Sequence, residues 1–107
     1  MSKTGDTFDE QILLMICETN VASRIVQALS ELDVSGYTSF GGVSGVGETG
    51  RHEGTSVWPG TNTIVFTVVA DPGMINEIIE HVEELIEAEY ARRPGFRAFS
   101  IPARSIV

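Results

Sequence analysis

The chain has few of the features that would place it in a specialised class of protein. It holds one cysteine among 107 residues, so an internal disulfide cannot form. No apolar run approaches the roughly 20 residues that a membrane-spanning helix needs. The apolar stretch Ile12–Cys17 is too short, and it follows Asp9 and Glu10 rather than the basic flank of a signal peptide. These absences predict one cytoplasmic domain that is not embedded in a membrane.

Basic residues are also scarce. Seven Lys and Arg stand against fifteen Asp and Glu, which gives a formal net charge of −8. Such a surface repels nucleic acids and anionic membranes, so no nucleic-acid partner is expected. Arg92, Arg93, Arg97 and Arg104 nevertheless lie within the last sixteen positions. Each one alone is an ordinary surface charge, but four together near a chain end leave a phosphate site open.

The two histidines are not placed like catalytic residues. His52 lies in a glycine-rich segment, and His81 lies on a predicted helix beside glutamates. Catalysis needs a base that is held in fixed geometry against its partner, so we expect neither enzyme activity nor a catalytic residue. Cys17 lies inside the apolar run ILLMIC and is expected to be a buried structural thiol.

The apolar pattern predicts four strands and two helices. The expected strands cover 11–17, 36–40, 63–70 and 96–101. The first helix is expected to start at a cap within 18–20 and to end near Asp33. The second starts at Asp71-Pro72, where aspartate caps the free amides, and ends before Pro94-Gly95. This order predicts an α+β domain of the ferredoxin-like type, with one four-stranded antiparallel sheet and both helices on one face.

The strand at 63–70 carries apolar side chains on both of its faces, because threonine and valine alternate with isoleucine, phenylalanine and valine. The face without helices is therefore expected to pack against other subunits, which predicts an oligomer. Tyr37 is expected to pack within the sheet. Trp58 is expected to anchor a turn or an interface.

Glycines concentrate between the second and third predicted strands, where residues 41–54 hold six of the eleven. Residues 45–50 match G-x-G-x-x-G, but no helical pattern follows at 51–55, so a dinucleotide-binding βαβ unit is excluded. Exposed amides of such a loop can cradle a phosphate or small anion, and a hairpin without a ligand is the alternative. A connection of this length is expected to be functional or disordered. Residues 1–10 are expected to form a flexible segment ahead of a single domain at 11–107.

Three segments of the chain resemble the P-II and P-II-like signalling proteins. They are Gly36-Tyr37-Thr38, then Gly45-Val46-Gly47 with Gly50-Arg51, and then the strand at 63–70. In that family a strand with G-x-T leads into G-x-G at the base of a long T-loop. The resemblance covers residues 11–107 and implies a ferredoxin-like homotrimer. It also implies that an adenine nucleotide (AMP, ADP or ATP) binds in clefts between subunits, with bicarbonate as a second ligand in some P-II-like proteins. No other cofactor is implied.

The resemblance also assigns residues to the nucleotide. Thr38 matches the family threonine near the base, and Gly45 and Gly47 match the T-loop glycines near the phosphates. Gly95 falls where the loop of the second half ends, and Arg104 lies at a basic position of the last strand.

The remaining arginines have an expected function if a nucleotide binds. Arg92, Arg93 and Arg97 are candidates for charge-assisted hydrogen bonds to its phosphates, and Arg51 is a candidate for a small anion. The T-loop, at about 41–60, is expected to dock on a transporter or enzyme through Val46, Glu48, His52, Glu53 and Trp58.

Several departures favour the P-II-like branch over the nitrogen regulator itself. The family pattern T-G-x-x-G-D-G-K is absent, and residues 91–97 read ARRPGFR instead. The spacing from Thr38 to Gly45 is one residue longer, and no tyrosine can be assigned as a uridylylation site. The alternative is a trimeric metal-binding protein of the CutA or efflux-associated type, with His52 and Glu53, or Cys17, as ligands. Transition-metal sites usually assemble three or four such donors.

Overall fold

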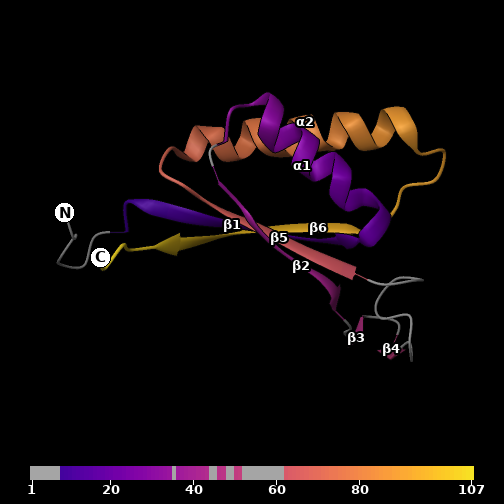
Figure 1. The fold of residues 1–107 in the computed structure, drawn as a ribbon, viewed down its shortest axis with the longest axis horizontal. Helices are drawn as coiled ribbons and strands as arrows, with labels where there is room; N and C mark the ends of the chain where they lie inside the picture. The colour runs from indigo at the N-terminus through magenta and orange to yellow at the C-terminus, as the bar shows by residue number, and fades with distance from the viewer. Residues whose placement is uncertain (1–7, 35, 44–45, 48–49, 52–61) are drawn as a thin grey trace.

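The computed structural model describes residues 8–34, 36–43, 46–47, 50–51 and 62–107 and shows two helices over one side of a sheet (Figure 1). The sheet strands are β1 (Glu10–Glu18), β2 (Thr38–Val43), β5 (Asn62–Val69) and β6 (Phe96–Ala103). The helices are α1 (Ala22–Glu31) and α2 (Pro72–Glu89), and a 3-10 turn, η1 (Thr19–Val21), precedes α1. Two short strands, β3 (Val46–Gly47) and β4 (Gly50–Arg51), lie between β2 and β5 in the sequence and, among the described residues, pair only with each other.

The sheet has the strand order β2-β5-β1-β6, and every neighbouring pair is antiparallel. Central β1 pairs with β5 from Gln11 to Glu18 and with β6 from Glu10 to Cys17. The predicted ferredoxin-like α+β fold, with four antiparallel strands and two helices on one face, is confirmed.

The core lies between the sheet and the helices. Alternate residues of β1 and β5 point toward the helices, because side chains of a strand alternate between its faces. The helices contribute apolar residues at three- and four-residue spacing. The buried apolar residues are Leu13, Met15, Cys17, Val21, Ile25, Ala28, Leu29, Val65, Val69, Ile78, Val82, Ile86 and Phe96.

The helix ends agree with the predictions except at the start of α1, and α2 ends at Glu89, before Pro94-Gly95. Asp71 caps α2 by accepting a hydrogen bond from the Gly73 amide at 2.9 Å, as predicted. Asp33 follows α1 with a φ of 58°, and the Val34 amide donates to the Leu29 carbonyl at 2.9 Å, which closes the helix in a Schellman-type turn.

The cap predicted within 18–20 is wrong. These residues end β1 and form the turn η1, and no side chain caps α1. Their polar groups have partners elsewhere, since Thr19 Oγ1 is hydrogen-bonded to Thr63 Oγ1 at 2.9 Å and the Asn20 carbonyl accepts from the Tyr90 hydroxyl at 2.9 Å.

Strand β2 is displaced from its predicted range of 36–40. It runs from Thr38 to Val43, so the first residues assigned to the loop continue the sheet. The pairing with β5 shifts register between Gly41 and Val43, where Gly42 has a φ of 69° that glycine adopts without strain. Tyr37 precedes the strand and is 47% exposed, so its expected packing within the sheet is wrong.

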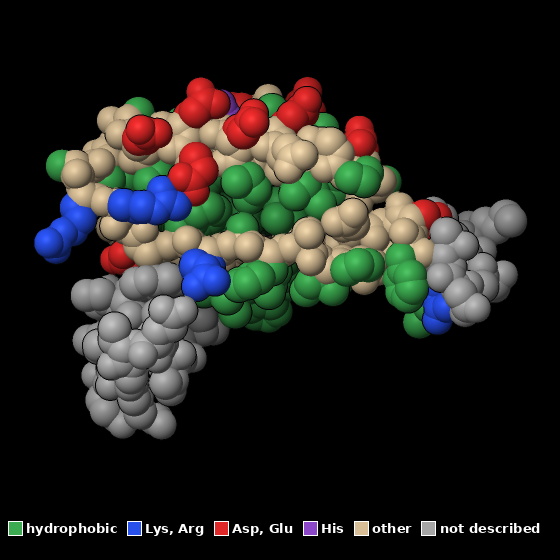
Figure 2. Space-filling model, turned by 180° about the vertical axis from the view of Figure 1, so that it is seen from behind, with side chains coloured by type: hydrophobic (Ala, Val, Ile, Leu, Met, Phe, Trp, Pro, Cys, Tyr) green, Lys and Arg blue, Asp and Glu red, His purple; other side chains and the backbone are tan. Residues whose placement is uncertain are grey.

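The helix-free face of the sheet is apolar. Leu14 on β1 is paired with Phe66 on β5 and with Phe99 on β6, so these three side chains share that face. The Phe40 and Phe66 rings stack with centroids 6.0 Å apart. Phe40, Val68, Phe99 and Ile101 are each more than 40% exposed. Figure 2 shows hydrophobic side chains along this side and acidic side chains over the helices.

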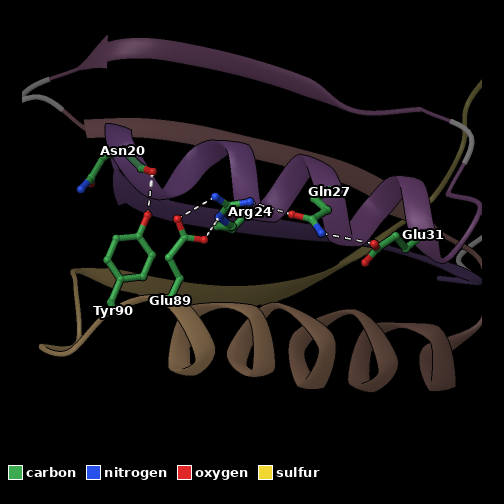
Figure 3. A network of polar contacts seen from close by, with 6 residues as sticks. All are labelled: Asn20, Arg24, Gln27, Glu31, Glu89 and Tyr90. Carbon is green, nitrogen blue, oxygen red and sulfur yellow. Dashed lines mark hydrogen bonds and ion pairs between the residues drawn. The ribbon is translucent and has the colours of Figure 1, made fainter.

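Polar contacts join the two helices along one seam (Figure 3). The Arg24 guanidinium on α1 reaches Glu89 of α2, with Nη2 at 2.7 Å from Oε1 and Nε at 2.5 Å from Oε2. Gln27 bridges Arg24 to Glu31, and His81 Nε2 lies 2.5 Å from Glu31 Oε1. The seam fixes the end of α2, and therefore where the following turn begins.

Candidate functional site

A cleft of about 630 Å³ opens at the end of the sheet where the chain passes from α2 to β6. Its lining residues come from the end of β1, the turn η1 and the turn between α2 and β6. They are Glu18, Asn20, Arg92, Arg93, Pro94, Gly95, Phe96 and Arg97. Basic side chains gather toward this end of the molecule in Figure 2.

The turn that carries the arginines is held at both of its ends. Tyr90 ends α2, its amide donates to the Ile86 carbonyl, and its hydroxyl donates to the Asn20 carbonyl. Pro94 is buried, and Gly95 is tied to β1 in two ways. The Glu18 amide donates to the Gly95 carbonyl at 3.0 Å, and the Gly95 amide donates to Glu18 Oε2 at 2.5 Å. The cleft therefore has a defined floor.

The arginines of the cleft differ in their contacts. Both terminal nitrogens of Arg93 donate to the two oxygens of Glu83 on α2, each at 2.7 Å. This hydrogen-bonded pair lowers the pKa of Glu83 below its usual range. Arg97 lies on the helix-free face with its guanidinium carbon 5.4 Å from the Phe99 ring centroid. Arg92 is exposed at the rim.

Other predicted site residues lie away from this cleft. Arg104 follows the far end of β6, roughly 25 Å along the strand from Phe96 at about 3.3 Å per residue. Thr38 lies at the β2 edge, in a separate hollow of about 410 Å³ formed with Gly36, Phe66 and their neighbours. Within one chain, Thr38 and Arg104 are therefore not brought together with Arg92, Arg93, Gly95 and Arg97.

The loop residues are described only in part. Val46 and Gly47 form β3, and Arg51 belongs to β4. The remaining loop predictions lie outside the described residues: Gly45, Glu48, His52, Glu53 and Trp58. The flexible segment expected at 1–10 also lies mostly outside them, while Glu10 is part of β1.

Sequence reasoning misses two paired residues, Glu18 at the end of β1 and Asn62 at the start of β5. The sequence places Glu18 only within a helix cap, yet its carboxylate holds the Gly95 amide. Asn62 is paired with Glu18 across the sheet, is 3% exposed, and its Oδ1 accepts no hydrogen bond from the described residues. The one available signal is that each is a polar residue directly at the end of a strongly apolar strand.

The described ranges give no support for a metal site, because they contain no cluster of three or more His, Cys, Asp or Glu that could hold an ion. Cys17 is buried, as predicted, and burial together with the charge of Glu18 raises its pKa to about 11. Of the helices in the described part of the chain, none has the length and apolar character to span a membrane.

Residues 11–107 match the family model described as nitrogen regulatory protein P-II. The chain belongs to the P-II family. The match covers the cleft and every strand from β1 residue 11 onward, so the family predicted from the G-x-T and G-x-G residues is confirmed. None of the curated proteins matches this P-II protein in sequence.

Solved structures share the fold of this P-II protein at low sequence identity. PII of Arabidopsis thaliana bound to citrate has a TM-score of 0.65 and 17% identity, over 90% of this chain and 78% of that one. CPII, a PII-like protein of Thiomonas intermedia K12 bound to ADP, AMP and bicarbonate, has a TM-score of 0.58 and 19% identity, over 92% of this chain and 96% of that one. A putative PII-like signaling protein of Thermus thermophilus has a TM-score of 0.52 and 21% identity, over 86% of this chain and 84% of that one. Both PII-like structures are consistent with the branch expected from the sequence.

Proposed function

We propose that this P-II protein is a trimeric sensor of adenine nucleotides. AMP, ADP or ATP binds in the cleft between subunits, with bicarbonate as a second ligand, and the T-loop at about 41–60 then regulates a transporter or enzyme. The observation that carries the proposal is the cleft at the turn 91–97, which presents three arginines and a backbone amide in a protein of net charge −8. CPII of Thiomonas intermedia was solved with ADP, AMP and bicarbonate, which supports the same ligand class here.

The separation of the predicted residues supports a cleft between subunits. Thr38 lies at one edge of the sheet and Gly95 at the end of the opposite edge strand. A neighbouring copy that packs on the apolar sheet face is a means to bring one chain's base-binding edge to another chain's arginines. The proposed nucleotide residues remain Thr38, Gly45, Gly47, Arg51, Arg92, Arg93, Gly95, Arg97 and Arg104.

Signalling, rather than catalysis, fits the chemistry of the cleft. Its side chains supply charge and hydrogen-bond donors to an anion, and His81, the histidine that the structure describes, does not line it. The free energy of ligand binding would offset the entropy lost when the glycine-rich loop becomes ordered, which is an order–disorder switch. The chain is proposed to act in the cytoplasm, with the transporter or enzyme as its partner.

Calorimetric titration tests the proposal. The protein is titrated with AMP, ADP, ATP and cyclic AMP, each with and without bicarbonate and magnesium. We expect about one nucleotide per subunit with micromolar affinity. The R93A/R97A double variant should lose roughly tenfold or more of that affinity, because charge-assisted hydrogen bonds to phosphate are removed. Absence of binding under every condition would reject the nucleotide proposal.

A further inference from the structure

Two carboxylates of the protein already occupy two of the anion-binding donors of the cleft, Gly95 and Arg93. The Gly95 amide donates to Glu18 Oε2 at 2.5 Å, and the Arg93 guanidinium donates through both terminal nitrogens to Glu83. A backbone amide and a bidentate guanidinium are also the groups that bind phosphate oxygens most strongly. A phosphate entering the cleft therefore meets donors that are not vacant.

We propose that Glu18 and Glu83 are internal competitors of the ligand, and that an oxyanion binds by exchanging with their carboxylates on Gly95 and Arg93. This inference rests on the proposed anion site and deepens it, because it names the residues that set its affinity and charge preference. The exchange is non-covalent. The Gly95 amide keeps one acceptor oxygen, and the Arg93 guanidinium keeps two, before and after the exchange.

The two exchanges differ in difficulty. The Arg93 and Glu83 side chains are 56% and 37% exposed, and exposed ion pairs contribute little in water. Glu18 is half-buried, and its backbone also pairs with Gly95, so its carboxylate has less freedom to leave. If it stays nearby, it repels the incoming anion in a partly desolvated place. Glu18 is therefore the residue that limits affinity.

The exchange also selects for charge. A monocarboxylate ligand would replace one carboxylate by another of equal charge and would gain little. A phosphate chain carries more negative charge than the group it displaces, and it can engage Arg92 as well as Arg93. The geometry thus favours phosphorylated ligands over simple carboxylates at this turn.

The test uses inorganic pyrophosphate as the probe, acetate at equal ionic strength as the comparison, and ADP in parallel. Binding is measured by calorimetry, and the Gly95 amide is followed by ¹⁵N NMR. The variants are E18Q, E83Q and the control E77Q, which makes the same charge change at an exposed position of α2. Glutamine at position 18 retains an oxygen that can accept from the Gly95 amide.

We expect pyrophosphate, but not acetate, to shift the Gly95 amide resonance. E18Q should bind pyrophosphate roughly tenfold more tightly, since a repelling charge is removed from a partly desolvated cleft. E83Q should gain about threefold, because its exposed pair is weaker. E77Q should stay within about twofold of the parent chain, the change expected for a distant, screened charge.

The inference is overturned if pyrophosphate leaves the Gly95 amide unchanged, or if neither E18Q nor E83Q binds it more tightly than E77Q does. If E18Q fails to fold, the pyrophosphate affinity of E83Q relative to that of E77Q alone decides whether the inference holds. If ADP binds and neither variant gains affinity, the sensor proposal stands and the exchange fails. If AMP, ADP and ATP all fail to bind while pyrophosphate binds and E18Q strengthens its binding, the exchange stands and the nucleotide proposal fails.

Discussion

Cys17 illustrates how position decides the chemistry of a single side chain. The residue is fully buried, its Sγ donates to the Thr63 carbonyl at 3.7 Å, and burial raises the thiol pKa to about 11. Its role could be predicted because it lies in an unbroken apolar run. Glu18, the next residue, could not be assigned from the sequence, because its partner Gly95 is 77 positions away and becomes adjacent only when β1 and β6 pair.

Cys17 is expected to resist thiol reagents in the native protein. At a pH of about 8 the folded thiol is largely protonated and shielded, whereas an unfolded cysteine has a pKa of about 8.5 and reacts readily. The measurement is the labelling rate with a chromogenic disulfide, with and without concentrated urea. Labelling of the native protein as fast as that of the unfolded chain would contradict the expectation.

The two helices form contacts that depend on how whole elements pack against each other. Their apolar stripes could be predicted from spacing, and both stripes face the core. The polar seam between the helices could not be predicted, because Arg24 contacts Glu89 and Glu31 contacts His81 only after the helices pack. Hydrogen bonds from Arg93 and His81 lower the pKa values of Glu83 and Glu31, respectively. These contacts anchor α2 beside α1 and before the arginine turn.

The lowered pKa of Glu83 predicts a pH-dependent stability. A carboxylate whose pKa is depressed in the folded state stabilises it fully above the ordinary glutamate value of about 4.3, and this contribution disappears as the pH falls through the folded pKa. E83Q should therefore lose at most about 1 kcal/mol near neutral pH and nothing in strong acid, because the pair is exposed. Urea unfolding across the acid range measures this. E77Q is the control, and identical pH profiles for the two variants would refute the role of the pair.

In the part of the chain that the structure describes, helices cover one face of the sheet and leave the other without helices. The ferredoxin-like order of strands could be predicted, because β1 and β5 are strongly apolar and each helix has an apolar stripe. The sequence could also indicate, from the double alternation in β5, that the second face is apolar. The separation of Thr38 from Gly95 follows from that order of strands, because the two residues lie at opposite edges of the sheet. That arrangement is what makes a single chain an incomplete nucleotide site under the proposed function.

The helix-free face is expected to be the interface of the proposed trimer. F99E places a charge on it at a residue that is 44% exposed in the single chain. Burying this charge in an apolar interface should lower the association constant by roughly two orders of magnitude or more. N76E, which places the same charge on the exposed side of α2, is the control. Light scattering after size-exclusion chromatography measures the mass, and an unchanged mass for F99E would show that this face is not the interface.

Strand β1 begins where β6 ends, since Glu10 is paired with Ala103 at the end of the sheet away from the cleft. A short linker across that end would close the backbone into a ring at a small entropic cost. The ring could then be opened at another surface connection, such as the one between α1 and β2, to give a circular permutant. Its sheet would keep the same neighbours, because the fold depends on which strands pair and not on the order in which the chain visits them.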